Sequence, residues 1–287
     1  MRLKGALCTI LSAFLYGFTP ILASLTYEMG NNSLSMTFYR NLFAIPFLYV
    51  LLKYNKLDLK IEKQDLKYII MVSVFGITAT TALLYSSYPY IGVGAATTLH
   101  FMYPVFVAVL CRYAFGENLS KQKIIALCLA CVGVFCFMDF QHIENILGVV
   151  MAVTSALTYA FYMTMVEKSG LVKISPYKLS FYIAIFAALT MLIGNIFIGY
   201  IVVNLPLKAF VFMIIVAFFT SFLAMILMQV GIREIGSTSA AIFSLFEPIT
   251  SVITGVLILN EAVSITKLIG CIVIFFSISY LAVSGKE

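Results

Sequence analysis

The feature that most restricts how this chain can fold is a series of ten long apolar runs. A helix needs about 20 consecutive apolar residues to cross the hydrocarbon core of a bilayer. The runs are continuous rather than alternating, which excludes a membrane β-barrel. We therefore predict an all-α integral membrane protein with ten transmembrane helices, at residues 5–27, 34–52, 67–88, 92–114, 122–139, 146–166, 177–202, 208–230, 236–259 and 265–284.

The composition leads to the same class. Of the 287 residues, 62% are hydrophobic and 10% are charged, whereas about a quarter of the residues of a soluble protein are charged. The longest polar connection, Lys53 to Lys67, is too short for a separate soluble domain. The basic N-terminus and the apolar run after it are similar to a signal peptide, but no small-residue cleavage site follows. We expect this run to be retained as the first span.

The basic residues predict the orientation of the spans, because cytoplasmic loops are enriched in Lys and Arg. With the N-terminus in the cytoplasm, nearly all of the 18 basic residues fall on the cytoplasmic side. Only Lys208 and Lys267 fall outside, and Arg40 lies within the second span near its outer end. We therefore expect both termini in the cytoplasm.

A degenerate repeat divides the chain into halves. The stretch Gly92 to Ser120 aligns without gaps with Gly236 to Ser264, and the first span aligns with the sixth. The identical pairs are Gly92/Gly236, Ala96/Ala240, Pro104/Pro248, Glu117/Glu261, Ser120/Ser264, Gly5/Gly148, Ser12/Ser155, Ala13/Ala156 and Tyr16/Tyr159. Five spans per half is an odd number, so the second half must be inverted relative to the first. We predict inverted repeats at 1–143 and 144–287, as in alternating-access transporters.

Three stretches resemble a known family: HFMYPVFVAVLCRYAFGENLS in the first half, LFEPITSVITGVLILNEAVS in the second, and FYRN at Phe38–Asn41. With the ten expected spans, they are similar to the drug/metabolite transporter superfamily, EamA type. The resemblance covers essentially the whole chain. It implies a central cavity lined by spans one, three, four, six, eight and nine. It also implies a small-metabolite substrate, such as an amino acid, an amine, a nucleotide-linked sugar or a drug, and often export.

Glu247 is the main candidate for the functional site. It lies near the midpoint of the ninth span, directly before Pro248. A charged side chain at that depth costs at least about 2.5 kcal/mol unless it is neutral, paired or beside water. Because desolvation disfavours the charged form of a carboxyl group, we predict that Glu247 binds the substrate or a coupling proton. The alternative is a structural carboxyl group bonded to a neighbouring helix.

His100 and Tyr103 lie close together in the fourth span, and Tyr103 occupies the repeat position of Glu247. Histidine titrates near physiological pH, so a proton relay between His100 and Glu247 is chemically reasonable. A packed, hydrogen-bonding histidine is the alternative. The other polar or aromatic candidates for substrate contact are Tyr16, Thr19, Thr78, Thr81, Tyr85, Tyr159, Tyr162 and Ser244.

A second set of residues is expected to have structural or gating roles. Arg40 is close enough to the end of its span to extend to the outer headgroups, although a role inside the bundle is also open. Pro104 and Pro248 are expected to free backbone carbonyls in the middle of their helices. Glu117 and Glu261 are expected to cap the fourth and ninth spans on opposite sides of the membrane.

Several function classes are excluded or disfavoured. We find no phosphate-binding loop, no hydrolase motif and no metal-spaced His/Cys set, so we expect no cofactor, no metal and no enzyme. The cysteines, including the pair Cys128 and Cys131, are expected to be small apolar core residues. The spread of basic residues along one membrane face argues against a nucleic-acid partner.

The sequence thus predicts a multi-pass secondary transporter of the cytoplasmic membrane, a monomer or homodimer among membrane lipids. It is expected to export a small metabolite, such as an amino acid or amine, with proton coupling. An uncoupled facilitative carrier or an importer is the nearest alternative. An integral-membrane enzyme acting on a lipid-linked substrate, and a channel or regulatory protein, are further alternatives.

Overall fold

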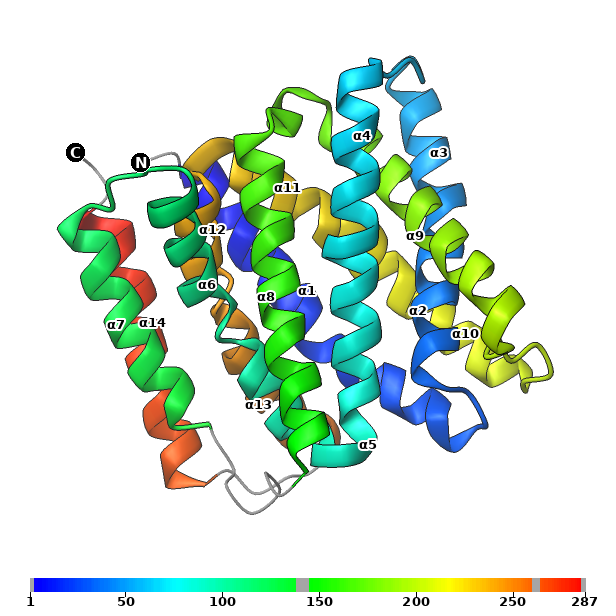
Figure 1. The fold of residues 1–287 in the computed structure, drawn as a ribbon. Coiled ribbons are helices and arrows are strands. Elements are labelled where there is room, and N and C mark those ends of the chain that lie inside the picture. Colours follow the sequence, from blue (N-terminus) through cyan, green and yellow to red (C-terminus); the bar gives the residue numbers. More distant parts are fainter. Residues whose placement is uncertain (1–2, 138–144, 260–263, 285–287) are drawn as a thin grey trace.

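The computed structural model describes residues 3–137, 145–259 and 264–284, and this part of the chain is helical, with no strand (Figure 1). Three segments, η1, η2 and η5, are π-helical, and η4 is a short 3₁₀ turn. The elements are α1 Leu3–Glu28, α2 Ser33–Leu42, α3 Ala44–Tyr54, α4 Lys63–Met71, η1 Val72–Thr78, α5 Ala79–His100, α6 Tyr103–Val109, η2 Leu110–Ala114, α7 Lys121–Phe135, α8 Ile146–Lys168, η4 Leu171–Lys173, α9 Pro176–Ile198, α10 Leu207–Val216, η5 Ala217–Ala224, α11 Met225–Ile235, α12 Ser237–Phe243, α13 Phe246–Leu259 and α14 Ile265–Ser284.

Seven helical runs among the described residues are long and apolar enough to cross a membrane, and a shorter apolar helix covers Tyr103–Ala114. One of the seven, Lys63–His100, contains the expected third span and the start of the fourth. The class of multi-pass helical membrane protein is therefore confirmed. The count of ten spans is not, and it stays a prediction.

The expected fourth and ninth spans are each interrupted. The fourth is broken at Phe101 and Met102, between α5 and α6, and the ninth at Ser244 and Leu245, between α12 and α13. The prediction that Pro104 and Pro248 lie in mid-helix was wrong. Both prolines occupy the first turn of a new helix, α6 or α13. In that turn a backbone N–H has no intrahelical acceptor, so proline is tolerated without loss of a hydrogen bond.

A glycine with nearly the same backbone conformation begins each of these interrupted stretches. Gly92 has φ 76° and ψ 158°, and Gly236 has φ 79° and ψ 160°. Residues with a Cβ rarely adopt these angles. The two positions were aligned from sequence, and each glycine follows a helix that contains a π-helical segment, η1 or η5.

Helices distant in sequence pack closely around the centre of the bundle. α1 packs against α11 and α13, and α8 packs against α5. Glycines allow the closest approaches: a Cβ on Gly5 would lie 2.6 Å from the Cβ of Glu234, and one on Gly148 would lie 2.7 Å from the Cβ of Tyr90.

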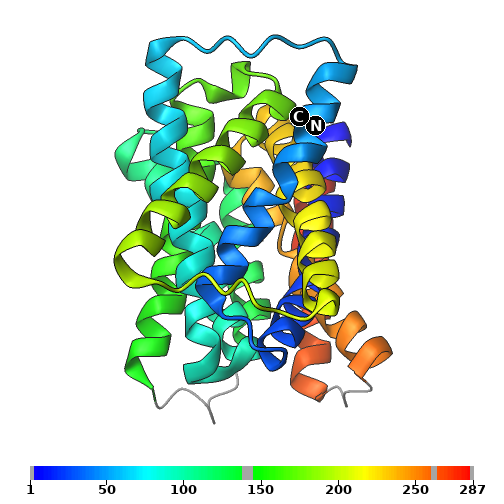
Figure 2. The ribbon, with the colours of Figure 1, turned by 90° about the vertical axis from the view of Figure 1, so that its right-hand side faces the viewer.

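The bundle has two distinct ends. The helices run between them, and the start of α1 and the end of α14 share one end, which we call the termini side (Figures 1 and 2). We call the opposite end the far side. α7 and α14 lie side by side at one flank (Figure 1). Cys128 and Cys131 lie on the exposed face of α7, so their prediction as core residues was wrong. Periodicity did not distinguish a lipid-facing surface from the core, since both are apolar.

Candidate functional site

A small cavity with several polar side chains in its wall lies at the centre of the bundle, with a volume of about 60 Å³. Segments from most of the chain's length contribute to it, from α1 to α13. We call it the central cavity, and its lining residues are Tyr16, Thr19, Pro20, Arg40, Ile77, Thr80, Thr81, Leu84, Tyr85, Tyr88, Thr97, His100, Tyr159, Thr220, Met225 and Glu247.

Seven of the residues predicted to contact substrate line this cavity: Tyr16, Thr19, Thr81, Tyr85, His100, Tyr159 and Glu247. The other four do not line it. The hydroxyl of Tyr103 is hydrogen-bonded to Ser244 Oγ at 2.5 Å, and the hydroxyl of Tyr162 donates to Met225 Sδ at 3.2 Å. Thr78 is buried, and its hydroxyl has no partner among the described residues.

Glu247 is the second residue of α13 and projects from the interrupted stretch into the cavity. Its position in the first helical turn is favourable for a carboxylate, because the N-terminal end of a helix is electropositive. No described side chain or backbone group forms a hydrogen bond or ion pair with its carboxyl group. The cavity therefore contains a carboxyl group that the described part of the chain leaves without a partner.

Arg40 supplies a positive charge to the same cavity. Its side chain is 5% exposed, so it does not extend to the headgroups as one prediction had it. Its Nε donates to Ser221 Oγ at 3.1 Å and its Nη1 donates to the Tyr85 hydroxyl at 2.7 Å. The guanidinium has five N–H donors, so these two contacts orient it and leave donors for a further acceptor.

His100 is held by groups other than Glu247. Its Nδ1 is hydrogen-bonded to Ser155 Oγ at 2.9 Å, and its ring centroid lies 5.4 Å from that of Tyr103 and 5.5 Å from that of Tyr159. His100 and Glu247 share the cavity without bonding to each other. The predicted relay is therefore not a direct contact in this conformation.

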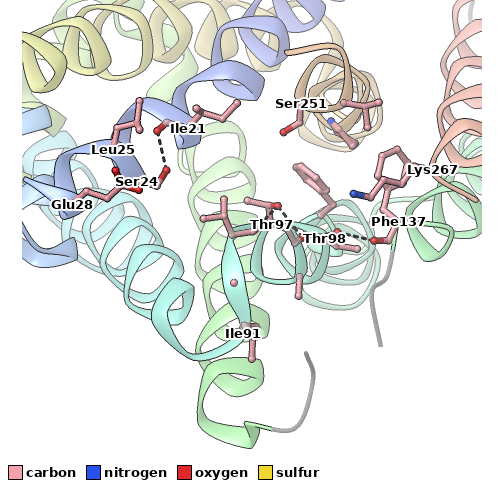
Figure 3. Close-up of a pocket in the computed structure, with 17 residues that line it drawn as sticks. Ile21, Ser24, Leu25, Glu28, Ile91, Thr97, Thr98, Phe137, Ser251 and Lys267 are labelled. Atoms are coloured by element: carbon pink, nitrogen blue, oxygen red, sulfur yellow. Dashed lines mark hydrogen bonds between the residues drawn. The ribbon is translucent and has the colours of Figure 1, made fainter. Parts of the chain in front are cut away.

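A larger cavity of about 450 Å³ opens toward the far side (Figure 3). We call it the vestibule. It shares Thr97 with the central cavity, and in Figure 3 Glu28 and Lys267 lie on opposite sides of it. Its lining residues are Ile21, Ser24, Leu25, Glu28, Ile91, Gly92, Val93, Gly94, Ala95, Thr97, Thr98, Phe101, Phe137, Pro248, Ser251, Val252 and Lys267.

On the termini side, ion pairs connect the loop after η2 and the start of α7 with the end of α8. Glu117 pairs with Lys123 at 3.2 Å and with Lys168 at 2.7 Å, and Lys168 also pairs with Glu167 at 2.9 Å. Glu167 in turn accepts a 2.6 Å hydrogen bond from the backbone N–H of Ser237, where α12 begins. Glu261, the predicted counterpart of Glu117, lies outside the described residues.

The same region brings potential metal ligands together. Cys111, Glu117 and Glu167 have ligand atoms within 4.8 Å of one another. Both carboxylates are already neutralised by lysine. Partial burial raises the pKa of Glu117, but hydrogen bonds and charge from Lys168 and Lys123 outweigh burial and hold the pKa of this carboxyl group below its ordinary value. Among the described residues, these contacts tie the termini-side ends of α8 and α12 to the loop after η2, whereas the vestibule lies toward the far side.

Several residues that line the central cavity, including Thr80, Tyr88 and Thr97, were not predicted from the sequence. Most residues that line the vestibule were not predicted either. Thr80 and Tyr88 share the α5 face of the predicted residues Thr81 and Tyr85, so helical spacing was an available signal for them. No pattern in the sequence indicated the vestibule, because its walls come from the ends of separate helices.

Comparison with known proteins gives consistent matches over most of the chain. A family model described as the EamA-like transporter family matches residues 3–138 and 146–283. The uncharacterized transporter YcbK of Bacillus subtilis is 22% identical over 285 residues, which cover 96% of this chain and 91% of YcbK. An uncharacterized transporter of Archaeoglobus fulgidus is 24% identical over 266 residues, covering 93% of this chain and 92% of its own. A crystal structure with 12% identity matches over 100% of both chains with a TM-score of 0.83, which shows a shared fold.

Proposed function

Because this chain belongs to the EamA-like transporter family, we propose that it is a secondary active transporter of the cytoplasmic membrane. It exports a small metabolite with an amino group, such as an amino acid or amine, in exchange for protons. It works by alternating access, in which the substrate site opens to one side of the membrane at a time. The central cavity is that site, and the vestibule is its path to the far side.

The unpartnered carboxyl group of Glu247 is the observation that supports this proposal most. A carboxyl group at membrane depth is costly, and a purely structural one would be bonded to a neighbouring helix. Here the missing partner is either the ammonium group of the substrate or a proton. Because both compete for the same group, one proton enters as one substrate molecule leaves.

The pairing of Glu247 with Arg40 supports the substrate class. An amino acid carries a carboxylate and an ammonium group, and the cavity offers one cation and one carboxyl group that make no ion pair with each other. Guanidinium groups bind carboxylates in a planar, bidentate geometry. The tyrosines of the cavity wall add ring faces and hydroxyl groups for the remainder of the substrate.

The inverted-repeat architecture, with halves at 1–143 and 144–287, is part of the same proposal. The family model matches each half separately, and Gly92 and Gly236 share their unusual backbone angles. With both termini in the cytoplasm, as the basic residues indicate, the far side is the outer side of the membrane. The described conformation is then open to the outside and closed to the cytoplasm.

Ligand-dependent thermal stability of the purified protein tests the proposal. A ligand that binds only the folded protein raises its midpoint of unfolding with concentration. We expect a saturable rise with an amino acid or amine, abolished in Glu247→Gln. The rise should be preserved in Glu28→Gln, a matched carboxyl replacement in the vestibule.

Flux into liposomes separates coupled from uncoupled transport. We expect an imposed pH gradient to drive uptake of the same ligand, and Glu247→Gln to lose this response. If Glu247→Gln transports normally and keeps its pH dependence, the coupling mechanism is wrong. Saturable counterflow that ignores the pH gradient in the wild type indicates the alternative, an uncoupled facilitative carrier.

A further inference from the structure

Matched contacts between the two parts of the chain allow their conformations to be compared. In the repeat alignment, His100 corresponds to Ser244, Tyr103 to Glu247 and Ser12 to Ser155. One pair of matched positions is in contact in both copies, although the donor differs. Ser12 Oγ donates to Ala224 O at 2.8 Å, whereas Thr80, the matched residue of Ala224, donates from Oγ1 to Ser155 O at 3.4 Å.

The close contacts of two matched glycines also occur in both copies. Gly5 approaches Glu234 and Ile235, while Gly148 approaches their counterparts Tyr90 and Ile91. The alignment therefore describes real packing, and the polar contacts made in one copy only are the places where the two halves can be compared further.

Two hydrogen bonds at the central cavity occur in one copy only. The Tyr103 hydroxyl bonds to Ser244 Oγ at 2.5 Å, but the matched groups, Glu247 and His100, are not bonded to each other. Likewise His100 bonds to Ser155, but the matched groups, Ser244 and Ser12, bond to backbone carbonyls and not to each other. Ser12 donates instead to Ala224 O.

The direction of these bonds is fixed by the serines. Ser244 Oγ donates its hydrogen to Ala241 O at 2.9 Å, and Ser155 Oγ donates its hydrogen to Ala152 O at 2.6 Å. Tyr103 must therefore donate to Ser244, and Nδ1 of His100 must donate to Ser155. A neutral His100 in this tautomer has Nε2 free as an acceptor.

In a transporter built from inverted repeats, the second state arises when one repeat moves against the other around a fixed site, and we take this movement to exchange the conformations of the halves. We propose that in the state open to the termini side, His100 leaves Ser155 and bonds to Glu247, while Ser244 leaves Tyr103 and bonds to Ser12. This inference rests on the proposed inverted-repeat transport cycle. The partner that Glu247 lacks in the present conformation is then supplied by His100 in the other.

The new bond has a defined chemistry. In the matched bond Tyr103 donates to Ser244. Because Glu247 matches Tyr103 and His100 matches Ser244, Glu247 is the donor and His100 the acceptor in the new bond. A carboxylic acid can donate to Nε2, and after proton transfer a carboxylate can accept from an imidazolium, so the pair holds one proton in either form. The other charged or titratable side chains that line the cavity are Arg40, Tyr16, Tyr85, Tyr88 and Tyr159.

Cys111 provides a native reporter of the termini side. It is fully buried, its Sγ lies 3.3 Å from Ser237 Oγ, and it belongs to the cluster with Glu117 and Glu167. Opening of the termini side separates Cys111 from Ser237 and admits water. A water-soluble maleimide then measures this state, provided that the other cysteines are replaced by alanine: Cys8, Cys128, Cys131, Cys136 and Cys271.

The test compares substitutions that remove bonds of one state only. Tyr103→Phe removes a bond of the present conformation only, so we expect Cys111 to react about two- to tenfold faster, the effect of losing one typical hydrogen bond. Glu247→Ala removes a bond of the other state only, and should slow the reaction by a similar factor. Glu247→Gln keeps a group that can bond to His100, and should stay within about twofold of the parent protein.

A second cysteine reporter, in the vestibule, shows whether a change in Cys111 labelling reflects a change of conformation or only a local disturbance around Cys111. Ser251→Cys lies in the vestibule (Figure 3) and should respond in the opposite direction in each variant. The double variant Tyr103→Phe/Glu247→Ala should return both rates toward the parent values. Thermal midpoints confirm that each variant is folded.

The inference is overturned if a folded Glu247→Ala leaves Cys111 labelling unchanged or accelerates it, or if Glu247→Gln slows it as much as alanine does. Labelling is measured without substrate. The inference can therefore fail while amino-acid transport is observed, and it can hold while the proposed substrate or proton coupling fails.

Discussion

Arg40 and Glu247 line one cavity from distant parts of the chain, and neither neutralises the other by an ion pair. Arg40 is oriented by Ser221 and Tyr85. Glu247 is placed by the start of α13, directly after the break at Ser244 and Leu245. A cationic and a carboxyl side chain, positioned by different helices, are the arrangement on which the proposed zwitterionic substrate depends.

Arg40→Lys is expected to weaken binding of an amino-acid substrate by about 10- to 100-fold, the range for hydrogen bonds to charged groups. Lysine carries the charge but lacks the planar fork that serves Ser221, Tyr85 and a carboxylate together. The measurement is the Kd from ligand-dependent stability. Arg233→Lys, on the exposed surface of α11, is the control and should leave the Kd unchanged. Equal affinities for the wild type and Arg40→Lys would remove Arg40 from the site.

Glu117→Gln is expected to lower the thermal midpoint at pH 7, because it breaks the pairs with Lys168 and Lys123. The cost should be about 1 kcal/mol or less, since partly exposed pairs contribute little. The pKa of Glu117 is held below its ordinary value, so its stabilisation is present above about pH 4.3, the ordinary pKa of a glutamate, and is lost as the pH falls through the lowered value.

The difference in midpoint between wild type and Glu117→Gln should therefore shrink as the pH is lowered from 5 toward 3. Glu62→Gln, an exposed carboxylate before α4, is the control and should give no such difference. A difference that stays constant over this pH range would show that the carboxylate charge is not what stabilises the fold.

Gly92→Ala is expected to destabilise the protein by about 1–3 kcal/mol, the usual cost of forcing such a backbone conformation on a residue with a Cβ. Nothing lies within 4 Å of the added Cβ, so the effect comes from the backbone alone. Gly94→Ala adds a Cβ in equally open space without a positive φ. It should be neutral or stabilise by up to about 1 kcal/mol, through helix propensity. Similar midpoints for the two variants would contradict the assigned backbone at Gly92.

Gly148→Ala is expected to cost about 1–3 kcal/mol by overpacking. Its Cβ would lie 2.7 Å from the Cβ of Tyr90 and 2.8 Å from Cγ2 of Ile91, so α5 and α8 must separate. Urea or thermal unfolding in detergent measures the loss, with Gly94→Ala again as the control. A midpoint equal to that of the wild type would mean that these helices are less closely packed.

Much of the architecture could be predicted from the sequence because the membrane-spanning class depends on the length of the apolar runs alone. The helical membrane class and the EamA family are confirmed. The breaks in the fourth and ninth spans were missed, since a proline at the start of a helix and one in its middle look alike in a row of apolar letters. What distinguishes them is where the preceding helix ends, and that is set by packing across the bundle.

The site could be predicted only in part, for a related reason. A lone carboxyl group in an apolar run is conspicuous, and it does line the central cavity. The place of Arg40 in the same cavity was not predicted, because depth along a span does not reveal which way a long side chain extends. Whether any of these residues bind substrate stays a prediction.

The solitary carboxyl group of Glu247 also affects how the protein must be handled. Closing the cavity around this carboxyl group without a ligand would cost desolvation free energy, so we expect the ligand-free form to be the less stable one. A compound that binds at Glu247, as proposed, should therefore act as a pharmacological chaperone. It lengthens the lifetime of the protein during synthesis and extraction, and its presence in the growth medium favours recovery of intact material.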